Sequence, residues 1–412
     1  MKLFTVDTIN QAQDKLFEYA QQILPEAEII TIDKAVGRVL SKDAFASENV
    51  PNFYRSTVDG YAVKAADTQG ANDSIPTFLR IAEEVKMGEA AKSIIKSGEC
   101  AYVPTGGMIP NGADAMVMVE YTELFSDDEV AIYQSTAVGK SVVVPGEDIK
   151  KGETVIKKGT LLKAEHIGAL ASAGIWQIEV YKPWNISVIS TGDELAAPYE
   201  TSSLGQVHDV NTWSLNAMAQ ECGFNIVKCI KVKDDMQIFK TELENAKKNS
   251  DILLTSGGSS QGKKDMTNDV MNMVCDKGTF THGLSIKPGK PTILAFDEAS
   301  KTFMIGLPGH PVAALTVFQA LIVDLWKKLT FQPKQKLMPA KMETNVAGAP
   351  GKTTFMLVKT YINEEGQLTA SPILAKSGLI NSMVGADGYI EIDMNKEGLK
   401  KGETVFIHRF GL

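Results

Sequence analysis

One segment of the chain, residues 251–265, constrains the fold most, because an apolar strand runs directly into a loop of glycines and hydroxyls and then into a helix. Its sequence is Asp251-Ile-Leu-Leu-Thr-Ser-Gly-Gly-Ser-Ser-Gln-Gly-Lys-Lys-Asp265. In parallel α/β sheets such a loop forms an anion pocket, because glycines let the backbone approach a ligand and N–H groups at a helix N-terminus favour negative charge. Lys263 and Lys264 add cations. We therefore predict a site for phosphate or another oxyanion.

The same segment has a simpler interpretation, in which Asp265 caps the helix expected at 266–275 and the glycines only permit a turn. A Gly-Gly pair alone would favour that interpretation. The spacing also departs from the phosphate-binding loop G-x-x-x-x-G-K-[ST] and from the dinucleotide fingerprint G-x-G-x-x-G. Neither of these common nucleotide sites is therefore indicated, and any ligand held here is of a less common kind.

Charge and composition limit the partners. The formal net charge is −8 over 412 residues, whereas a general nucleic-acid binder needs a basic stripe to displace counterions. We expect no nucleic-acid partner. Arginine occurs only at Arg38, Arg55, Arg80 and Arg409, so few guanidinium forks are available to grip phosphate. Any anion must be bound by nearby lysines and backbone amides.

The chain also lacks the patterns of export and membrane insertion. Residues 1–7 show no basic region followed by an apolar run, so we expect no secretory signal and a cytoplasmic protein. The most apolar stretch, 312–326, contains Thr316, Gln319 and Asp324 and is too short to cross a bilayer, so we predict a buried helix and no membrane role. The four cysteines show no C-x-x-C spacing, which favours buried free thiols over zinc.

Periodicity divides the chain into regions of different character. Apolar residues recur at helical spacing over 5–24, short β-rich runs fill 29–181, and β runs return after 333. Between 185 and 329 strands and helices alternate. We predict strands at 186–190, 226–232, 251–255, 291–296 and 303–307, and helices at 212–222, 235–248, 266–275 and 311–329.

This pattern predicts a multidomain α/β protein, since its length alone suggests about two to four domains. A doubly wound, mostly parallel sheet domain is expected at 183–332. A β-rich domain is expected at 51–144, an elongated discontinuous linker domain at 1–50 and 145–182, and a C-terminal β-barrel at 333–412.

Ligands of such sheets bind beyond the carboxyl ends of the strands. Glycine-bearing loops follow strands at Ser190-Thr-Gly-Asp-Glu194, at 255–265 and at Gly306-Leu-Pro-Gly-His-Pro311. Together with the turn Lys287-Pro-Gly-Lys290 they are predicted to line one crevice. His310 has two interpretations here, as a crevice contact and as the start of a helix.

Acidic side chains are expected in the same crevice. Glu194 and Asp265 follow strands, and Asp209 precedes a helix. Several carboxylates would repel an anion unless a hard cation intervenes, so Mg²⁺ is the natural bridge. Each carboxylate taken singly is also explained as a helix cap or a solvated turn, and for Asp209 the cap is favoured.

Ordered motifs over nearly the whole chain resemble a known family, the molybdopterin molybdenumtransferases, which include MoeA and the gephyrin E domain. The resemblance rests on Arg55-Ser-Thr-Val-Asp-Gly-Tyr-Ala62, Pro104-Thr-Gly-Gly, Asn111-Gly-Ala-Asp-Ala-Met-Val-Met-Val-Glu120, Gly146-Glu-Asp-Ile-Lys-Lys-Gly152, Ser190-Thr-Gly-Asp-Glu-Leu195, Thr255-Ser-Gly-Gly-Ser-Ser, Ile286-Lys-Pro-Gly-Lys-Pro291 and Gly306-Leu-Pro-Gly-His-Pro311.

This resemblance implies a molybdopterin molybdotransferase that cleaves adenylated molybdopterin in a Mg²⁺-dependent step, releases AMP and inserts molybdate at the dithiolene sulfurs. It implies four domains, with a MogA-like α/β domain. It further implies a homodimer, in which Asp59 reaches the site from the partner copy, and a molybdopterin adenylyltransferase as the upstream partner.

The resemblance also implies site residues by motif match. The predicted catalytic residues are Asp59, Asp148, Glu194 and Asp265, with Glu194 and Asp265 as metal ligands. The predicted substrate-binding residues are Thr105, Thr191, Asp234, Ser256, Gly257, Gly258, Ser259, Lys287, Lys290, Pro308, Pro311, Lys352 and Ser377.

Departures from the family pattern cluster at basic positions. Thr212 and Lys352 stand where the family has arginine, and Gly283 and Gly385 replace other basic residues. Each lost bidentate contact would weaken oxyanion binding by on the order of 1–3 kcal/mol if nothing compensates. Three hypotheses follow: an active molybdenum insertase, a pterin-binding or scaffold paralogue with little turnover, and an insertase that prefers tungstate.

Overall fold

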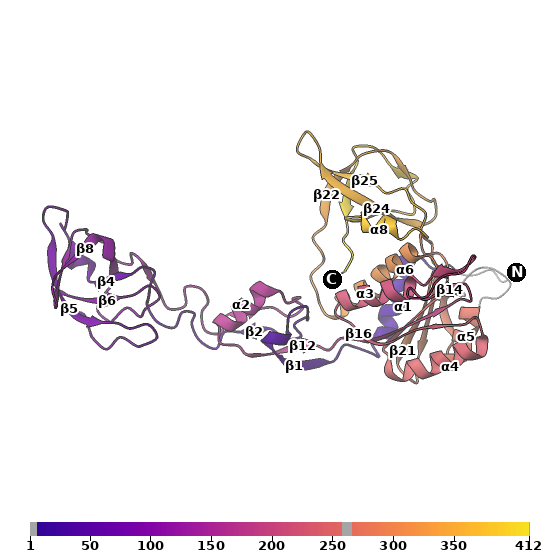
Figure 1. The fold of residues 1–412 in the computed structure, drawn as a ribbon, viewed down its shortest axis with the longest axis horizontal. Helices are drawn as coiled ribbons and strands as arrows, with labels where there is room; N and C mark the ends of the chain where they lie inside the picture. Colours follow the sequence, from indigo (N-terminus) through magenta and orange to yellow (C-terminus); the bar gives the residue numbers. More distant parts are fainter. Residues whose placement is uncertain (1–5, 258–265, 412) are drawn as a thin grey trace.

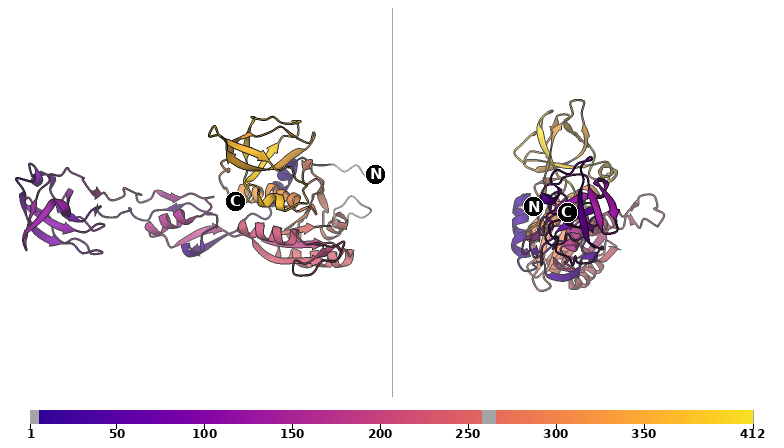
Figure 2. Two further views of the ribbon diagram at one scale, coloured as in Figure 1. Left: turned by 45° about the horizontal axis from the view of Figure 1, so that its top comes forward. Right: turned by 90° about the vertical axis from the view of Figure 1, so that its left-hand side faces the viewer.

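The protein is elongated, with a β-rich domain at one end and the α/β and C-terminal domains at the other (Figures 1 and 2). A slender middle part, which holds α2 (Ala164–Ser172), joins the two ends. The computed structural model describes residues 6–257 and 266–411. The predicted fold class is therefore confirmed, while the boundaries between the predicted domains stay predictions.

The α/β domain is built on a six-stranded sheet in the order β16-β13-β17-β21-β20-β18. Its strands are β13 (Asn185–Thr191), β16 (Asn225–Val232), β17 (Ile252–Ser256), β18 (Thr279–His282), β20 (Ile293–Asp297) and β21 (Thr302–Leu307). The first four strands in this order pair in parallel, and β20 and β18 pair antiparallel. The predicted doubly wound, mostly parallel sheet is confirmed. The sequence prediction omits β18, a four-residue edge strand whose side chains are mostly half-buried.

Helices cover both faces of this sheet (Figure 1). One face carries α1 (Ile9–Ala20), α3 (Asn211–Glu221) and α6 (Pro311–Phe318), which share a core containing Leu16, Leu215 and Phe318. The other face carries α4 (Met236–Ala246) and α5 (Met266–Val274), which pack around Phe239 and Val270. The helices α1, α4 and α5 each bury one apolar stripe, whereas every residue of α6 is buried, because the C-terminal part of the chain covers its other side.

The helix predicted at 311–329 is not uniform, which corrects the sequence prediction. It consists of α6, a π-helical segment at Gln319–Val323 and α7 (Asp324–Leu329). Gln319 is buried, and its Oε1 accepts a hydrogen bond of 2.7 Å from the backbone N–H of Gly411. The wider turn thus occurs where a buried amide side chain binds the end of the C-terminal domain.

The β-rich domain contains a six-stranded sheet in the order β7-β4-β6-β5-β9-β8. The strands are β4 (Gly60–Val63), β5 (Thr77–Glu84), β6 (Glu99–Val103), β7 (Ala115–Met118), β8 (Thr122–Ser126) and β9 (Glu129–Ile132). In the linker, α2 accompanies the paired strands β1 (Ala27–Thr31) with β12 (Gln177–Tyr181), and β2 (Ala44–Phe45) with β11 (Thr154–Ile156).

The C-terminal domain is a curled sheet that closes on itself. Its strands include β22 (Met338–Met342), β24 (Thr353–Ile362), β25 (Leu368–Pro372), β26 (Gly388–Ile392) and β28 (Thr404–Ile407). A bridge between Tyr389 and His408 returns the chain after β28 to β26. The short strand β19 (Ile286–Lys287), which comes from the α/β domain, pairs with β24. This pairing anchors the 287–290 turn between the two domains.

The cysteines are free thiols: Cys100, Cys222 and Cys275 are buried, and Cys229 is half-buried. Burial raises the pKa of each of the three buried thiols to about 12. Thiols that stay protonated at neutral pH are poor nucleophiles and metal ligands. Among the described residues no helix is both long and apolar enough to cross a membrane.

Candidate functional site

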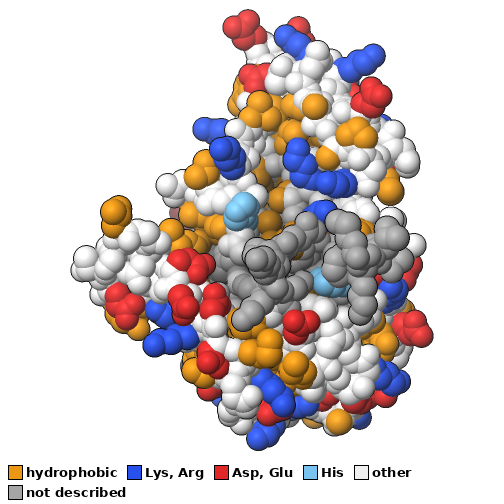
Figure 3. Space-filling model, turned by 90° about the vertical axis from the view of Figure 1, so that its right-hand side faces the viewer, with side chains coloured by type: hydrophobic (Ala, Val, Ile, Leu, Met, Phe, Trp, Pro, Cys, Tyr) orange, Lys and Arg blue, Asp and Glu red, His pale blue; other side chains and the backbone are white. Residues whose placement is uncertain are grey.

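A cavity of about 1310 Å³ lies between the carboxyl ends of the α/β strands and the C-terminal domain. It brings together nine of the predicted site residues, namely Thr191, Glu194, Asp234, Gly257, Lys287, Lys290, Pro308, Lys352 and Ser377. In the space-filling view, basic side chains and a histidine border the hollow between the upper and lower lobes (Figure 3). The predicted crevice between the strand-end loops therefore exists, and its far wall belongs to the C-terminal domain.

The floor of the cavity depends on a close contact between two strand ends. Gly257, at the end of β17, has φ +104°, and a Cβ at this position would lie 2.0 Å from the carbonyl oxygen of Thr191. Only glycine fits this left-handed, crowded position. The buried Thr191 hydroxyl donates a hydrogen bond to Asp234 Oδ1, so the loops after β13 and β16 are also tied together.

The cations of the cavity are lysines. Lys287, Lys290 and Lys352 line it as predicted, and Lys376 lines it as well. Within residues 6–257 and 266–411, none of these ammonium groups forms an ion pair. Sequence reasoning missed Lys376, although it directly precedes Ser377. Gly385 is not among the residues that line the cavity.

The acidic side of the cavity is formed by Glu194 and Asp234. Both residues are exposed. The described part of the chain holds no group of three or more His, Cys, Asp or Glu side chains that could bind a metal by itself. Mg²⁺ commonly binds through one or two carboxylates together with substrate phosphates, and these two carboxylates fit that requirement. Asp265, the other predicted metal ligand, lies outside the described residues.

Ser377 and His310 link the two walls of the cavity. His310 Nδ1 lies 2.8 Å from Ser377 Oγ, and the backbone N–H of Val312 donates to the Ser377 carbonyl at 3.2 Å. His310 both lines the cavity and occupies the N-cap position of α6, so both of its sequence interpretations hold. Pro311, by contrast, is the buried first residue of α6 and does not line the cavity.

Asn211 is a buried polar residue that sequence reasoning missed. Its Nδ2 donates to Ser256 Oγ at 2.6 Å and to the Gly309 carbonyl at 2.9 Å. Its Oδ1 is buried without a hydrogen-bond partner. The amide therefore ties the end of β17 to the loop after β21. Ser256 itself is buried against this amide and does not line the cavity.

Asp209 is a cap, as the sequence favours. Its carboxylate accepts hydrogen bonds from the backbone N–H of Thr212 at 3.0 Å and from the Thr212 hydroxyl at 2.5 Å. Both residues are buried. Thr212, which stands where the family has arginine, thus stabilises the start of α3 and does not line the cavity.

Other predicted site residues lie away from this cavity or outside the described part of the chain. Asp59 and Thr105 belong to the distant β-rich domain (Figure 1), where Asp59 Oδ1 accepts a hydrogen bond of 2.8 Å from the Thr105 backbone N–H. Asp148 is exposed and does not line the cavity either. Gly258 and Ser259, like Asp265, lie outside the described residues.

Family models match almost the whole chain. The MoeA N-terminal region (domain I and II) matches residues 8–174, a probable molybdopterin binding domain matches 187–328, and the MoeA C-terminal region (domain IV) matches 339–410. The order of these three matches agrees with the order of the folded parts described above.

Full-length relatives and a solved structure agree with these matches. A putative molybdopterin biosynthesis protein of Methanocaldococcus jannaschii is 33% identical, covering 96% of this chain and 95% of that protein. A molybdopterin molybdenumtransferase of Haemophilus influenzae is 30% identical, covering 98% of both chains. A molybdopterin biosynthesis MoeA protein of Pyrococcus horikoshii has the same fold, with a TM-score of 0.81 at 33% identity, covering 98% of this chain and 99% of that one. The chain belongs to the MoeA family, and it is a transferase of molybdenum cofactor biosynthesis.

Proposed function

We propose that the protein inserts molybdate into adenylated molybdopterin and releases AMP in a Mg²⁺-dependent step. The observation that carries this proposal is one cavity lined by lysines that form no ion pair among the described residues, by the carboxylates of Glu194 and Asp234, and by apolar side chains. An anionic nucleotide, an oxyanion and a planar pterin ring need these three kinds of surface together.

The lysines are the proposed oxyanion site. Lys287 and Lys290 sit on the turn that β19 anchors, while Lys352 and Lys376 approach from the C-terminal domain. Ammonium groups without internal partners can compensate the charge of molybdate near the dithiolene sulfurs. The Gly257 end of β17 would hold phosphate or pterin through backbone N–H groups.

Glu194 is the proposed metal ligand within the described residues, and Asp265 is the second proposed ligand. Bound Mg²⁺ would neutralise the pyrophosphate charge and so favour release of AMP. Asp234, fixed by the Thr191 hydroxyl, would orient the substrate by accepting its hydrogen bonds. In this arrangement the carboxylates and the lysines act on opposite ends of one substrate.

A homodimer would complete the site. Asp59 and Thr105 form an exposed, hydrogen-bonded pair far from their own chain's cavity (Figure 1). We propose that a second copy brings this pair, with Asp148, to the cavity. A molybdopterin adenylyltransferase would supply the adenylated substrate, and both proteins would act in the cytoplasm.

AMP release from adenylated molybdopterin, with Mg²⁺ and molybdate, tests the proposal. We expect turnover by the wild type and a loss of on the order of 100-fold or more for Glu194→Gln. The matched control is Glu364→Gln, in an exposed turn after β24, which should leave turnover unchanged. A fully active, normally folded Glu194→Gln variant would contradict the role of Glu194.

The same assay separates the alternatives. Pterin binding by the wild type without AMP release would replace the insertase by a binding or scaffold paralogue, a hypothesis motivated by the missing arginines. Parallel reactions with tungstate and molybdate, alone and in competition, would name the preferred anion.

A further inference from the structure

His310 is a cavity residue to which neither the site residues implied by the family resemblance nor the proposed chemistry assigns a role. Its ring lies beside Gly378, where a Cβ would be 3.7 Å from its Cδ2, and its Nδ1 lies 2.8 Å from Ser377 Oγ. The backbone of Ser377 is held separately through the N–H of Val312. The imidazole and the serine hydroxyl thus face each other in a fixed geometry between two domains.

The direction of the hydrogen bond between these two groups decides what Ser377 offers to a ligand. A hydroxyl has one hydrogen and two lone pairs. If Ser377 donates to Nδ1, only its lone pairs remain for the cavity, and these repel an oxyanion. If Nδ1–H donates to Ser377 Oγ, the hydroxyl hydrogen is free to donate to the oxyanion.

An oxyanion that accepts hydrogen bonds from this wall therefore selects the state in which Nδ1 carries the hydrogen. The surrounding charges favour the same ligand, because Lys287, Lys290 and Lys376 also line the cavity without ion pairs in the described part of the chain. Arginine forks are lacking here, so an oriented hydroxyl is a compensating donor.

We propose that His310 is a positioning residue for the oxyanion, which acts by donating from Nδ1 to Ser377 and thereby turning the Ser377 hydroxyl toward the bound anion. This inference rests on the proposed oxyanion site. The inference adds to that site His310, a residue of the α/β domain that orients the hydroxyl of Ser377 in the C-terminal domain.

Calorimetric binding of molybdate and of tungstate to the intact protein tests this role. We expect Ser377→Ala to weaken binding about tenfold, which is the effect of one hydrogen bond to a charged group, and His310→Ala to weaken it by a smaller factor, because the hydroxyl remains but is no longer oriented. The double variant should bind no worse than Ser377→Ala, because without the hydroxyl His310 has no donor to orient. His310→Asn should restore most of the affinity, since its Nδ2 can take the place of Nδ1, whereas His310→Gln should not.

The control is His166→Ala, in the linker domain, where Nδ1 accepts a hydrogen bond of 3.0 Å from the Lys163 backbone N–H. It should bind oxyanion like the wild type. Unchanged affinity in a folded His310→Ala variant would overturn the inference, as would additive effects of the two alanine changes together with no rescue by His310→Asn. A wild type that binds neither anion would instead overturn the proposed oxyanion site on which the inference rests.

Discussion

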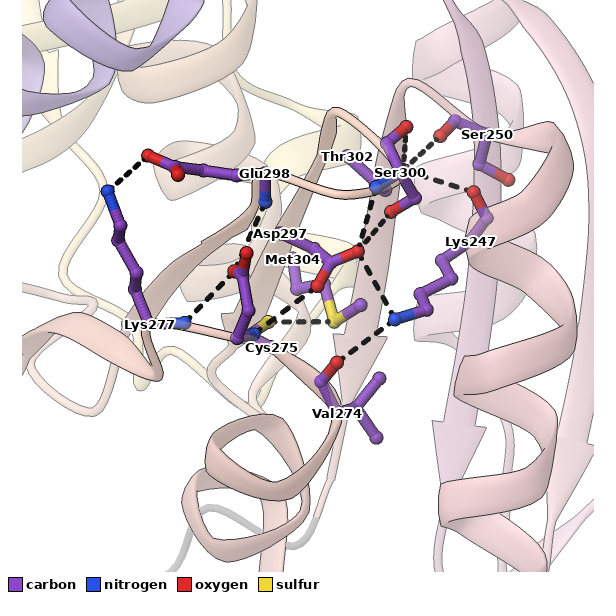
Figure 4. Close-up of polar contacts among 11 residues, drawn as sticks. Lys247, Ser250, Val274, Cys275, Lys277, Asp297, Glu298, Ser300, Thr302 and Met304 are labelled. Carbon is purple, nitrogen blue, oxygen red and sulfur yellow. Dashed lines mark hydrogen bonds and ion pairs between the residues drawn. The ribbon is translucent and has the colours of Figure 1, made fainter.

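The two ends of the α/β sheet use charged side chains in opposite ways. At the carboxyl ends of the strands, the lysines of the cavity have no ion-pair partners among the described residues. At the other end, Lys247 Nζ donates to Asp297 Oδ2 at 3.2 Å and to the Val274 carbonyl at 3.0 Å (Figure 4). Charges that hold the fold are paired within it, whereas charges left unpaired remain available to a ligand.

The end of the sheet at which Lys247 and Asp297 pair, here called the paired end, joins α4, α5 and the turn between β20 and β21. Asp297 is 1% exposed and accepts hydrogen bonds from the backbone N–H and the hydroxyl of Ser300 as well as from Lys247 (Figure 4). Burial alone would raise the pKa of Asp297, but these hydrogen bonds and the Lys247 charge outweigh it and lower the pKa. Asp297 is therefore stabilised as a carboxylate.

The largest expected effect is on stability at this paired end. Asp297→Ala leaves Lys247 with a partly buried, uncompensated charge and should cost about 3 kcal/mol of unfolding free energy. Glu298→Ala breaks only the nearby pair between Glu298 and Lys277, in which the side chains are 32% and 58% exposed, and should cost much less than Asp297→Ala. Denaturant midpoints of the two variants measure the difference, and equal midpoints would contradict this contrast.

Asn211 shares features with both ends of the sheet. It is buried and hydrogen-bonded, like the charged pair Lys247–Asp297, and yet it connects backbone segments beside the cavity. Asn211→Ala leaves the Gly309 carbonyl and the Ser256 hydroxyl without this donor and should cost about 2 kcal/mol. Oxyanion affinity should fall as well, because the loops lose their connection.

Asn216→Ala, on the same helix, is the matched control, since among the described residues the Asn216 side chain only accepts a hydrogen bond from Gln220. It should change neither quantity. Loss of stability without loss of affinity in Asn211→Ala would show that its role is confined to the fold.

At the carboxyl ends of the strands, where the lysines have no ion-pair partners among the described residues, a substitution should weaken oxyanion binding without a loss of stability. Lys287→Ala should weaken molybdate binding about tenfold, the effect of one hydrogen bond to a charged group. The thermal midpoint should stay the same or rise, because like charges in the cavity no longer repel. Lys359→Ala, an exposed lysine on β24 outside the cavity, should alter neither measurement. A destabilised Lys287→Ala variant would mean that the lysine has a structural partner.

The smallest expected effect concerns pH. Burial, above all, raises the pKa of Asp324, on α7, whereas the pKa of Asp297 is lowered. The folded-state contribution of Asp297 is present above its ordinary pKa of about 3.9 and is lost as the pH falls through its lower folded value. Asp324 behaves oppositely: its charged form costs stability above its raised folded pKa, and this cost decreases as the pH falls below that value and is gone below the ordinary pKa.

Asp324→Asn should therefore stabilise the protein at neutral pH and flatten the stability profile between the ordinary and the raised pKa. Thermal midpoints over a pH series of the wild type and of Asp324→Asn measure this. A variant that is less stable at pH 7 would show that the carboxylate is needed in its charged form.

Much of the α/β domain could be predicted from the sequence, because its strands are continuous apolar runs and its helices carry apolar stripes. The glycine-bearing strand ends also located the cavity floor, since parallel strands place such loops at one edge. The edge strand β18 and the π-helical segment at Gln319–Val323 were beyond such reasoning. The first is short and half-buried, and the second contains a buried amide bonded to a residue far along the chain.

Only part of the site could be predicted from the sequence. Lys287 and Ser377 reach the same cavity, although the chain between them includes most of the C-terminal domain. Asp59 and Thr105 do not reach it within one chain, because a linker holds the β-rich domain away (Figure 1). Asn211 and His310 form hydrogen bonds with partners that are distant in sequence. No local pattern pointed to Asn211, and for His310 the sequence offered the crevice contact only beside a helix start.

The most direct test of the claim that the cavity lysines bind an oxyanion is a crystal structure of the protein with tungstate. The tungsten atom gives an unambiguous anomalous signal. We expect the anion between the two walls of the cavity, within hydrogen-bonding distance of Lys287 or Lys290 and of the Ser377 hydroxyl. A fully occupied tungstate elsewhere, with this cavity empty, would contradict the assignment of the unpaired lysines to oxyanion binding.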